Sequence, residues 1–185
     1  MADELIDVVD ENNQLLGITE YKSVAHKKGL WHRSAHVWVY NTRSEILLQL
    51  RATDKELYPD LWDISVAGHV GAGEDAVTAA LREAEEEISL PIREADLKFW
   101  TIRKAAKTVG ELKDNEFSYV YFHEYDGDVD HLSVQEEEVQ SVRFTPMVEI
   151  EQAVSIGEGN YVPHGIYWSE VLDVIRYLGY GTVSH

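Results

Sequence analysis

The sequence contains no cysteine, and this absence excludes several chemistries at once. Without cysteine there is no disulfide bond, no thiolate metal ligand and no cysteine nucleophile. Basic residues are also scarce, because 16 Lys and Arg stand against 34 Asp and Glu, giving a formal net charge of -18. Nucleic acids and anionic membrane surfaces attract basic patches, so this charge argues against non-specific binding to either. Neither nucleic acid nor a membrane is therefore an expected partner.

Long apolar runs are absent as well. No stretch approaches the roughly 18 apolar residues that a membrane-spanning helix needs. The acidic start, MADELIDVVDENN, lacks the basic flank and apolar run of a secretory signal. The chain also has no internal repeat, low-complexity tract or Pro/Ser-rich linker. With 185 residues, 44% of them hydrophobic, we expect a single soluble, cytoplasmic domain over residues 1–185.

Apolar patterns along the chain predict mostly β-strands, with helices in the middle and at the end. Turn-forming residues between apolar runs predict a hairpin over 3–20 and another with its turn at 41–44. Helical periodicity predicts a helix over 74–89 and two C-terminal helices within 147–179, where Gly179 is a plausible stop. Further strands are expected at LWDISVAGHV, 96–106, 116–125 and VQSVRFTP. A mixed β-sheet sandwiched between α-helices, an α/β/α fold, is the natural layered arrangement of these elements.

The predicted helix over 74–89 carries four glutamates within five residues near its C-terminal end. Glu83, Glu86 and Glu87 share one helix face, whereas Glu85 points elsewhere. Like charges at these spacings cost about 0.2–0.5 kcal/mol per pair. Carboxylates near a helix C-terminus oppose the helix dipole by a further ~0.3–1 kcal/mol each. Three converging carboxylates suit a hard divalent cation such as Mg²⁺, which would offset the repulsion and attract a phosphate.

The stretch GHVGAGEDAVTAALREAEEEISL, residues 68–90, resembles the Nudix box, Gly-x5-Glu-x7-Arg-Glu-U-x-Glu-Glu-x-Gly-U, in which U is apolar. The positions that follow it are Gly68, Glu74, Arg82, Glu83, Ala84, Glu86, Glu87 and Leu90. Ser89 replaces the late glycine, which helps to end the helix, so we expect some loss of stability but no lost ligand. The resemblance implies a Nudix fold and Mg²⁺- or Mn²⁺-dependent hydrolysis of a small-molecule diphosphate. By family habit it also implies a homodimer.

The resemblance implies roles for individual residues. The implied metal ligands are Glu83, Glu86, Glu87 and the carbonyl oxygen of Ala67. Arg82 would orient Glu83 or Glu86, and Glu74 would support the loop and the helix. A carboxylate must also take the proton of the attacking water, and Glu83 and Glu116 are the candidates. We favour Glu116 as the base, because Glu83 is more useful as a ligand of the metal. Glu116 could also contact the metal.

Segments outside the box resemble the branch of the family that includes isopentenyl diphosphate isomerase. They are HKKGLWHRSAHVWVYN, YPDLWDISVAGHV and DNEFSYVYF. That enzyme binds a metal through three histidines and two acids, and uses a cysteine just before its Gly-His pair. The matching positions here are His32, His69, Asp114 and Glu116, with His26 displaced by one residue. Because the cysteine position is Ala67, the isomerase chemistry is disfavoured while the architecture is shared.

Several side chains are candidates for substrate contact, each with a structural alternative. Arg51 follows a strand and could bind phosphate, and Trp62 belongs either to the core or to the pocket wall. His32 and His69 could contact metal or phosphate, or be buried imidazoles bonded to backbone. The leading hypothesis is a Nudix pyrophosphohydrolase acting on a nucleotide-like diphosphate. The alternatives are an isomerase-like enzyme and a non-catalytic Nudix-fold module that binds nucleotides.

Overall fold

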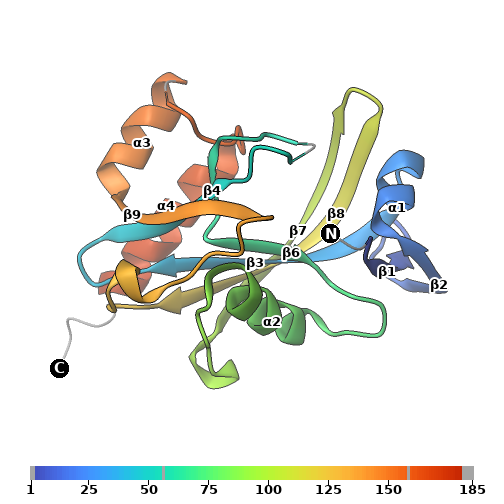
Figure 1. Cartoon of the computed structure of the whole chain (residues 1–185), viewed down its shortest axis with the longest axis horizontal. Helices are drawn as coiled ribbons and strands as arrows, with labels where there is room; N and C mark the ends of the chain where they lie inside the picture. Colours follow the sequence, from blue (N-terminus) through green and yellow to red (C-terminus); the bar gives the residue numbers. More distant parts are fainter. Residues whose placement is uncertain (1–2, 56, 158, 181–185) are drawn as a thin grey trace. The chain divides into compact units, whose positions relative to one another are not determined.

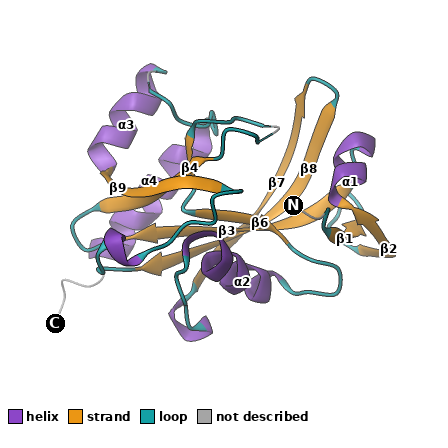
Figure 2. Ribbon diagram, viewed as in Figure 1, coloured by secondary structure: helices purple, strands orange, loops and turns teal. Residues whose placement is uncertain are grey.

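The computed structural model describes residues 3–55, 57–157 and 159–180. The chain divides into two compact units. Figures 1 and 2 show the strands and helices of the chain. The first unit comprises Met1–Val37 and Val66–Phe122, and the second comprises Trp38–Ser65 and His123–His185. Strand β3 (Trp31–Tyr40) gives its first residues to one unit and its last to the other. That the whole chain is one Nudix domain stays a prediction.

Two hairpins form much of the first unit. In the N-terminal hairpin, β1 (Leu5–Val9) pairs antiparallel with β2 (Leu15–Tyr21). In the second hairpin, β7 (Lys98–Val109) pairs antiparallel with β8 (Leu112–Glu124), with Ala105 opposite Glu116. Successive side chains of a strand point to opposite faces, so Asp114, Glu116 and Ser118 share one face of β8. This register gathers two acidic side chains of β8 on the same side.

Strand β3 joins these hairpins to the short strand β6 (Val66–His69). It pairs with β1, β6 and β8, and His36 stands opposite Ala67 in the β3–β6 ladder. Helix α1 (Lys22–Lys28) precedes β3 and ends at Gly29, whose φ of 66° closes the helix in the left-handed region. The histidines of α1, β3 and β6 are thereby carried on neighbouring elements.

Helix α2 (Ala76–Ile88) packs on β6 and carries the box glutamates. Asp75 caps its N-terminus by accepting a hydrogen bond from the Thr78 N–H at 2.8 Å. The buried face contains small and apolar residues, but it also contains Glu83 and Glu87, which are 7% and 4% exposed. Two of the three glutamates therefore lie against the strand rather than on a solvated face.

The second unit is built around strand β4 (Glu45–Arg51). It pairs antiparallel with β5 (Trp62–Asp63) and with β9 (Val139–Pro146), while its Ile46 pairs with Tyr40 at the end of β3. The remaining elements are α3 (Met147–Ile156), α4 (Ile166–Tyr180) and the 3₁₀ turn Val129–His131; a further 3₁₀ turn, Glu94–Asp96, belongs to the first unit. Trp38 packs edge-on against Tyr167 and Trp168 of α4, and its indole N–H donates to the Tyr167 hydroxyl at 2.9 Å.

The predicted α/β class, a mixed sheet with helices packed against its strands, is confirmed. Helix α1 was missed, because its seven residues are too few to show an apolar period. The expected stop at Gly179 was wrong, since α4 continues through it to Tyr180. A glycine lowers helix stability by about 1 kcal/mol but does not prevent a helix. The packing of the preceding turns therefore decides where the helix ends. Within the described residues, no helix has both the length and the hydropathy needed to cross a bilayer.

The segment LWDISVAGHV, expected as one strand, is two. Its first part, β5, pairs with β4, whereas its second part, β6, pairs with β3. Between them Ser65 turns its hydroxyl to the backbone, donating to Leu47 O and accepting from the Val39 N–H. The change of strand partner depends on these long-range hydrogen bonds, which the apolar pattern of the segment does not encode.

Candidate functional site

The box carboxylates lie against the backbone of β6. A Cβ added to Gly68 would lie 2.0 Å from the carboxyl carbon of Glu83, so only glycine leaves space for that side chain. One residue earlier, the Ala67 N–H donates to Glu87 Oε2 at 3.3 Å. The glycine that opens the box therefore serves to admit Glu83, and β6 provides a hydrogen-bond donor for Glu87.

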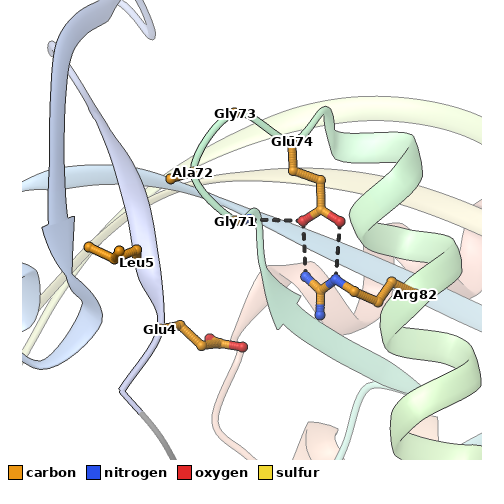
Figure 3. A pocket seen from close by; sticks show the side chains of 7 residues that line it. All are labelled: Glu4, Leu5, Gly71, Ala72, Gly73, Glu74 and Arg82. Atoms are coloured by element: carbon orange, nitrogen blue, oxygen red, sulfur yellow. Dashed lines mark hydrogen bonds and ion pairs between the residues drawn. The ribbon is translucent and has the colours of Figure 1, made fainter.

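Arg82 connects the loop to the helix. Its guanidinium has five N–H donors, and every one has an acceptor. Two of them bind the Glu74 carboxylate, Nε to Oε1 and Nη2 to Oε2, both at 3.0 Å. Nη1 donates to Glu83 Oε1 at 2.8 Å and to Glu86 Oε2 at 3.0 Å, and Nη2 also donates to the His69 carbonyl at 3.1 Å. Figure 3 shows the paired contact between Arg82 and Glu74. With all five donors used, Arg82 has none left for a substrate phosphate, so its contribution is to hold the acids in place.

Burial and charge set the protonation of these acids. Burial raises the pKa of Glu83 to about 7, although the Arg82 guanidinium opposes the rise. Burial would also raise the pKa of Glu74, but hydrogen bonds from Arg82 and the Gly71 N–H hold it below its usual range. Glu74 is thus a permanently charged support, whereas Glu83 exchanges its proton near neutral pH.

A second cluster of metal-ligating side chains lies on α1, β3, β6 and β8. The ring centroids of His26, His32 and His69 are 5.1 to 5.4 Å apart, and a ligand atom from each lies within 4.8 Å of the other two. Asp114 and Glu116 complete the cluster, and His32, Asp114 and Glu116 also satisfy that 4.8 Å limit. We call these five residues the histidine–acid cluster.

Separations within the histidine–acid cluster exceed normal hydrogen-bond lengths. Glu116 Oε1 lies 3.6 Å from Nε2 of both His32 and His69, and Asp114 Oδ1 lies 3.8 Å from His26 Nε2. The Nε2 atoms of His32 and His69 are buried and have no hydrogen-bond partner among the residues that the structure describes. Buried polar atoms without partners are costly, and a cation between imidazoles and carboxylates would satisfy them. The cluster therefore fits a divalent metal ion.

Charge inside the histidine–acid cluster suits a metal ligand at Glu116 and His69, whereas His32 keeps its proton to a higher pH than usual. Burial would raise the pKa of Glu116, but His32 and His69 hold it well below its usual range. Burial and the neighbouring His32 keep the pKa of His69 well below its usual value, so this imidazole is neutral at pH 7. Burial also lowers the pKa of His32, but the Glu116 carboxylate outweighs burial and raises it overall. An ionised carboxylate and a neutral imidazole are the ligand forms that metals bind.

The structure separates residues that the sequence grouped together. In the part of the chain that is described, Glu83, Glu86 and Glu87 do not form a set of three with ligand atoms within 4.8 Å. Arg82 draws Glu83 and Glu86 towards the loop, Glu87 turns to the Ala67 N–H, and the side chain of Glu86 is 53% exposed. The metal roles of these residues and of the Ala67 carbonyl stay predictions.

Arg51 and Trp62, predicted to contact substrate, belong to the second unit and are occupied there. Arg51 Nη1 pairs with the buried Asp63 at 2.9 Å, and its Nε and Nη2 donate to the Leu57 carbonyl. The guanidinium of Arg143 covers the Trp62 ring at 4.0 Å from the centroid. These contacts support structural roles for both side chains, and their contact with substrate stays a prediction.

An open pocket of about 450 Å³ lies beside the Gly-rich loop of the first unit. It is lined by Glu4, Leu5, Gly71, Ala72, Gly73, Glu74 and Arg82 (Figure 3). The carboxylate of Glu4 extends from the N-terminal strand towards the helix that carries Arg82 (Figure 3). Sequence reasoning missed Glu4, and no local signal marks it, because only strand pairing brings residue 4 to the loop.

Comparison with known proteins places this arrangement in a family. Residues 30–164 match the NUDIX domain, and the chain belongs to this family, as the box resemblance predicted. An uncharacterized Nudix hydrolase of Streptomyces coelicolor is 37% identical over 168 residues, covering 89% of this chain and 86% of that protein. Nudix hydrolase 3 of Arabidopsis thaliana is 33% identical over 95% of this chain, but the chain spans only 24% of the plant protein.

The isomerase branch and the fold are also represented among similar proteins. Isopentenyl-diphosphate Delta-isomerase 1 of Aromatoleum aromaticum is 35% identical over 128 residues, covering 69% of this chain and 70% of that protein. The crystal structure of DR0079 from Deinococcus radiodurans superposes with a TM-score of 0.67 at 20% identity, over 92% of this chain and 98% of that one. The latter likeness shows the fold alone.

Proposed function

We propose that this chain hydrolyses the phosphoric anhydride bond of a small-molecule diphosphate with the help of divalent cations. The observation that carries the proposal is the Arg82 network, in which one guanidinium holds Glu74, Glu83 and Glu86 around the Gly-rich loop. Every acid of the box is present in the sequence. A module that only bound nucleotides would have no need for this array of carboxylates.

Two sets of residues would hold the cations. The first is the box set, Glu83, Glu86 and Glu87, whose oxygens suit Mg²⁺ or Mn²⁺. The second is the histidine–acid cluster, whose imidazoles suit Zn²⁺ and whose two carboxylates suit Mn²⁺. The chemistry that a divalent cation supplies in such sites is charge neutralisation on the anhydride oxygens and a lowered pKa for bound water.

The proton of the attacking water needs a base whose pKa lies near the working pH. Burial gives Glu83 a pKa of about 7, whereas Glu116 is held well below its usual range by His32 and His69. Since Glu83 Oε1 accepts from Arg82, Oε2 is the atom that would take the proton. In the metal-free protein these surroundings favour Glu83 as the base and Glu116 as a metal ligand. A cation bound to Glu83 would lower its pKa, and Glu116, the base preferred from the sequence, is then the alternative.

A screen of nucleoside di- and triphosphates, dinucleoside polyphosphates and nucleotide sugars with Mg²⁺ or Mn²⁺ tests the proposal, scored by released phosphate or pyrophosphate. For a substrate found in this way, Glu83→Gln should lower kcat by at least about 100-fold, the scale of general-base catalysis. Glu85→Gln, an exposed change on the same helix, is the matched control and should leave kcat unchanged. Turnover that survives replacement of Glu83, Glu86 and Glu87 together by glutamine would refute the proposal.

Isomerisation of an isoprenoid diphosphate is a second candidate. The histidine–acid cluster favours it, because three histidines and two acids are the ligand set of the isomerase that this sequence resembles. Ala67 stands where that enzyme has a cysteine, and the chain contains no other cysteine to replace it. Incubation with isopentenyl diphosphate and Mn²⁺, followed by chromatography of the products, separates the two functions. An allylic isomer without phosphate release would favour isomerisation over hydrolysis.

A further inference from the structure

The N-terminal hairpin is built into the site, although the match to the NUDIX domain begins only at residue 30. Strand β1 runs beside the Gly-rich loop, where Leu5 O accepts the Ala72 N–H at 2.9 Å and Asp7 Oδ2 accepts the Gly73 N–H at 2.8 Å. These bonds fix β1 against the loop. Glu4 is the residue immediately before this contact.

The hairpin is also fixed at its turn. Arg33 donates to the side-chain oxygen and to the carbonyl of Asn13, both at 2.7 Å, and Asn13 donates to the Tyr119 hydroxyl at 2.9 Å. At the other end, the carbonyl of Glu4 accepts the Lys22 N–H at 2.8 Å. Glu4 is thus carried by an element held at both ends, which is the support that a positioning side chain needs.

The carboxylate of Glu4 lies next to one ring nitrogen of His69. Glu4 Oε2 is 3.9 Å from His69 Nδ1 and 3.6 Å from Lys22 Nζ. The other ring nitrogen, Nε2, is buried and lies 3.6 Å from Glu116 Oε1 in the histidine–acid cluster. The imidazole therefore stands between two carboxylates, one from the hairpin and one from the cluster.

A neutral imidazole has one N–H and one lone pair, and the acceptor beside one nitrogen decides which nitrogen keeps the lone pair. Histidines that bind metals usually donate their second N–H to a carboxylate or a carbonyl. We propose that Glu4 is a positioning residue that accepts the Nδ1–H of His69 and so turns the Nε2 lone pair towards a divalent cation in the histidine–acid cluster. Because 3.9 Å is longer than a hydrogen bond, the proposal requires the Glu4 side chain, which is 35% exposed, to rotate towards Nδ1.

This inference rests on the proposed function only in assuming that the cluster binds a cation. Long-range ¹H–¹⁵N NMR spectra of the metal-free protein test the tautomer directly, without any activity. Glu116 is nearer to Nε2 than Glu4 is to Nδ1, so both tautomers of His69 should be populated in the metal-free wild-type protein. We expect Glu4→Ala to lower the share of the Nδ1–H form. Glu4→Gln keeps an acceptor oxygen and should keep the wild-type share.

Titration calorimetry with Mn²⁺ supplies the second measurement. Loss of a carboxylate behind a metal-binding histidine weakens metal affinity by about 10–100-fold, so we expect this loss in Glu4→Ala and little loss in Glu4→Gln. Glu20→Gln is the matched control, because it removes a half-buried carboxylate of the same hairpin that pairs with Lys28. Glu4→Ala could weaken Mn²⁺ binding merely by loosening β1. Glu4→Met keeps the aliphatic part of the side chain, so it must lower the Mn²⁺ affinity by the same factor if the carboxylate is what matters.

An unchanged share of the Nδ1–H tautomer in Glu4→Ala would overturn the inference, as would wild-type Mn²⁺ affinity in both Glu4→Ala and Glu4→Met. Failure of the proposed function gives a different result. In that case the wild-type protein releases no phosphate from any diphosphate in the screen, while the tautomer of the metal-free protein still decides the role of Glu4. The two failures are therefore distinguishable.

Discussion

The carboxylate of Glu83 occupies the space where a side chain at Gly68 would be. A Cβ at Gly68 would approach the Glu83 carboxyl carbon to 2.0 Å and its Oε1 atom to 2.3 Å. The first fixed glycine of the box is therefore tied to its first helical glutamate, fifteen residues later, through space. This relationship explains why the glycine is required although it does not adopt a positive φ.

Gly68→Ala should displace Glu83 and reduce activity. Overpacking of this kind costs about 1–3 kcal/mol of stability, and the displaced carboxylate should lower kcat by at least about tenfold, since small misplacements are costly in catalysis. Urea unfolding and steady-state kinetics check both effects. Gly179→Ala is the matched control, because nothing lies within 4 Å of the added Cβ in α4. The prediction is contradicted if the two variants behave alike.

Arg82→Lys should be poorly tolerated even though it keeps the charge. An ammonium has three donors and cannot satisfy Glu74, Glu83, Glu86 and the His69 carbonyl together. Buried acceptors left without donors cost about 1–3 kcal/mol, so we expect a loss of this size in the free energy of unfolding. Arg93→Lys, which breaks an exposed pair with Asp96, should change it by less than about 0.5 kcal/mol. Equal effects of the two changes would refute the hub role of Arg82.

Stability of the metal-free protein should fall between pH 5 and pH 8 because of Glu83. Its pKa is about 7 in the folded protein against an ordinary value of 4.5. The folded state holds this proton more tightly than the unfolded chain does. The resulting stabilisation is complete below pH 4.5 and is lost as the pH rises through about 7.

Urea unfolding at pH 5 and pH 8, with a chelator present, measures this loss. The shift predicts that Glu83 contributes on the order of 1–3 kcal/mol to the difference. Glu83→Gln, which cannot ionise, should reduce the pH dependence by that amount, whereas Glu85→Gln should not. Added Mg²⁺ should restore stability at pH 8 in the wild-type protein and in Glu85→Gln, but not in Glu83→Gln. An unchanged pH dependence in Glu83→Gln would show that its carboxyl does not titrate in this range.

Ser89→Gly should stabilise the protein. Ser89 ends α2 with a φ of 52°, in the left-handed region, where a residue with a Cβ pays about 1–2 kcal/mol. The melting temperature should rise by roughly 2–4 °C per kcal/mol gained in a chain of this size. Ser155→Gly in the last turn of α3 is the opposite control and should not stabilise, because this residue has no positive φ and glycine is a poor helix former. A fall in melting temperature for Ser89→Gly would contradict the expected strain.

What the sequence determined by itself was local. The spacing of glycines, acids and Arg82 over residues 68–90 predicted the family. The same stretch predicted the loop and the helix, because these depend on interactions between residues that are close in the sequence. The serine at the late glycine position of the box predicted some loss of stability, and the positive φ of Ser89 gives that prediction a physical reason. The loss itself stays a prediction.

Only the tertiary structure decided which residues meet. His26, His32 and His69 come from a helix and two strands, and pairing of β3 with β6 brings two of them together. The tertiary structure also brings Glu4 to His69, because β1 is fixed against the Gly-rich loop. Strand partners and register are set by long-range hydrogen bonds and burial, which no local period of the sequence records.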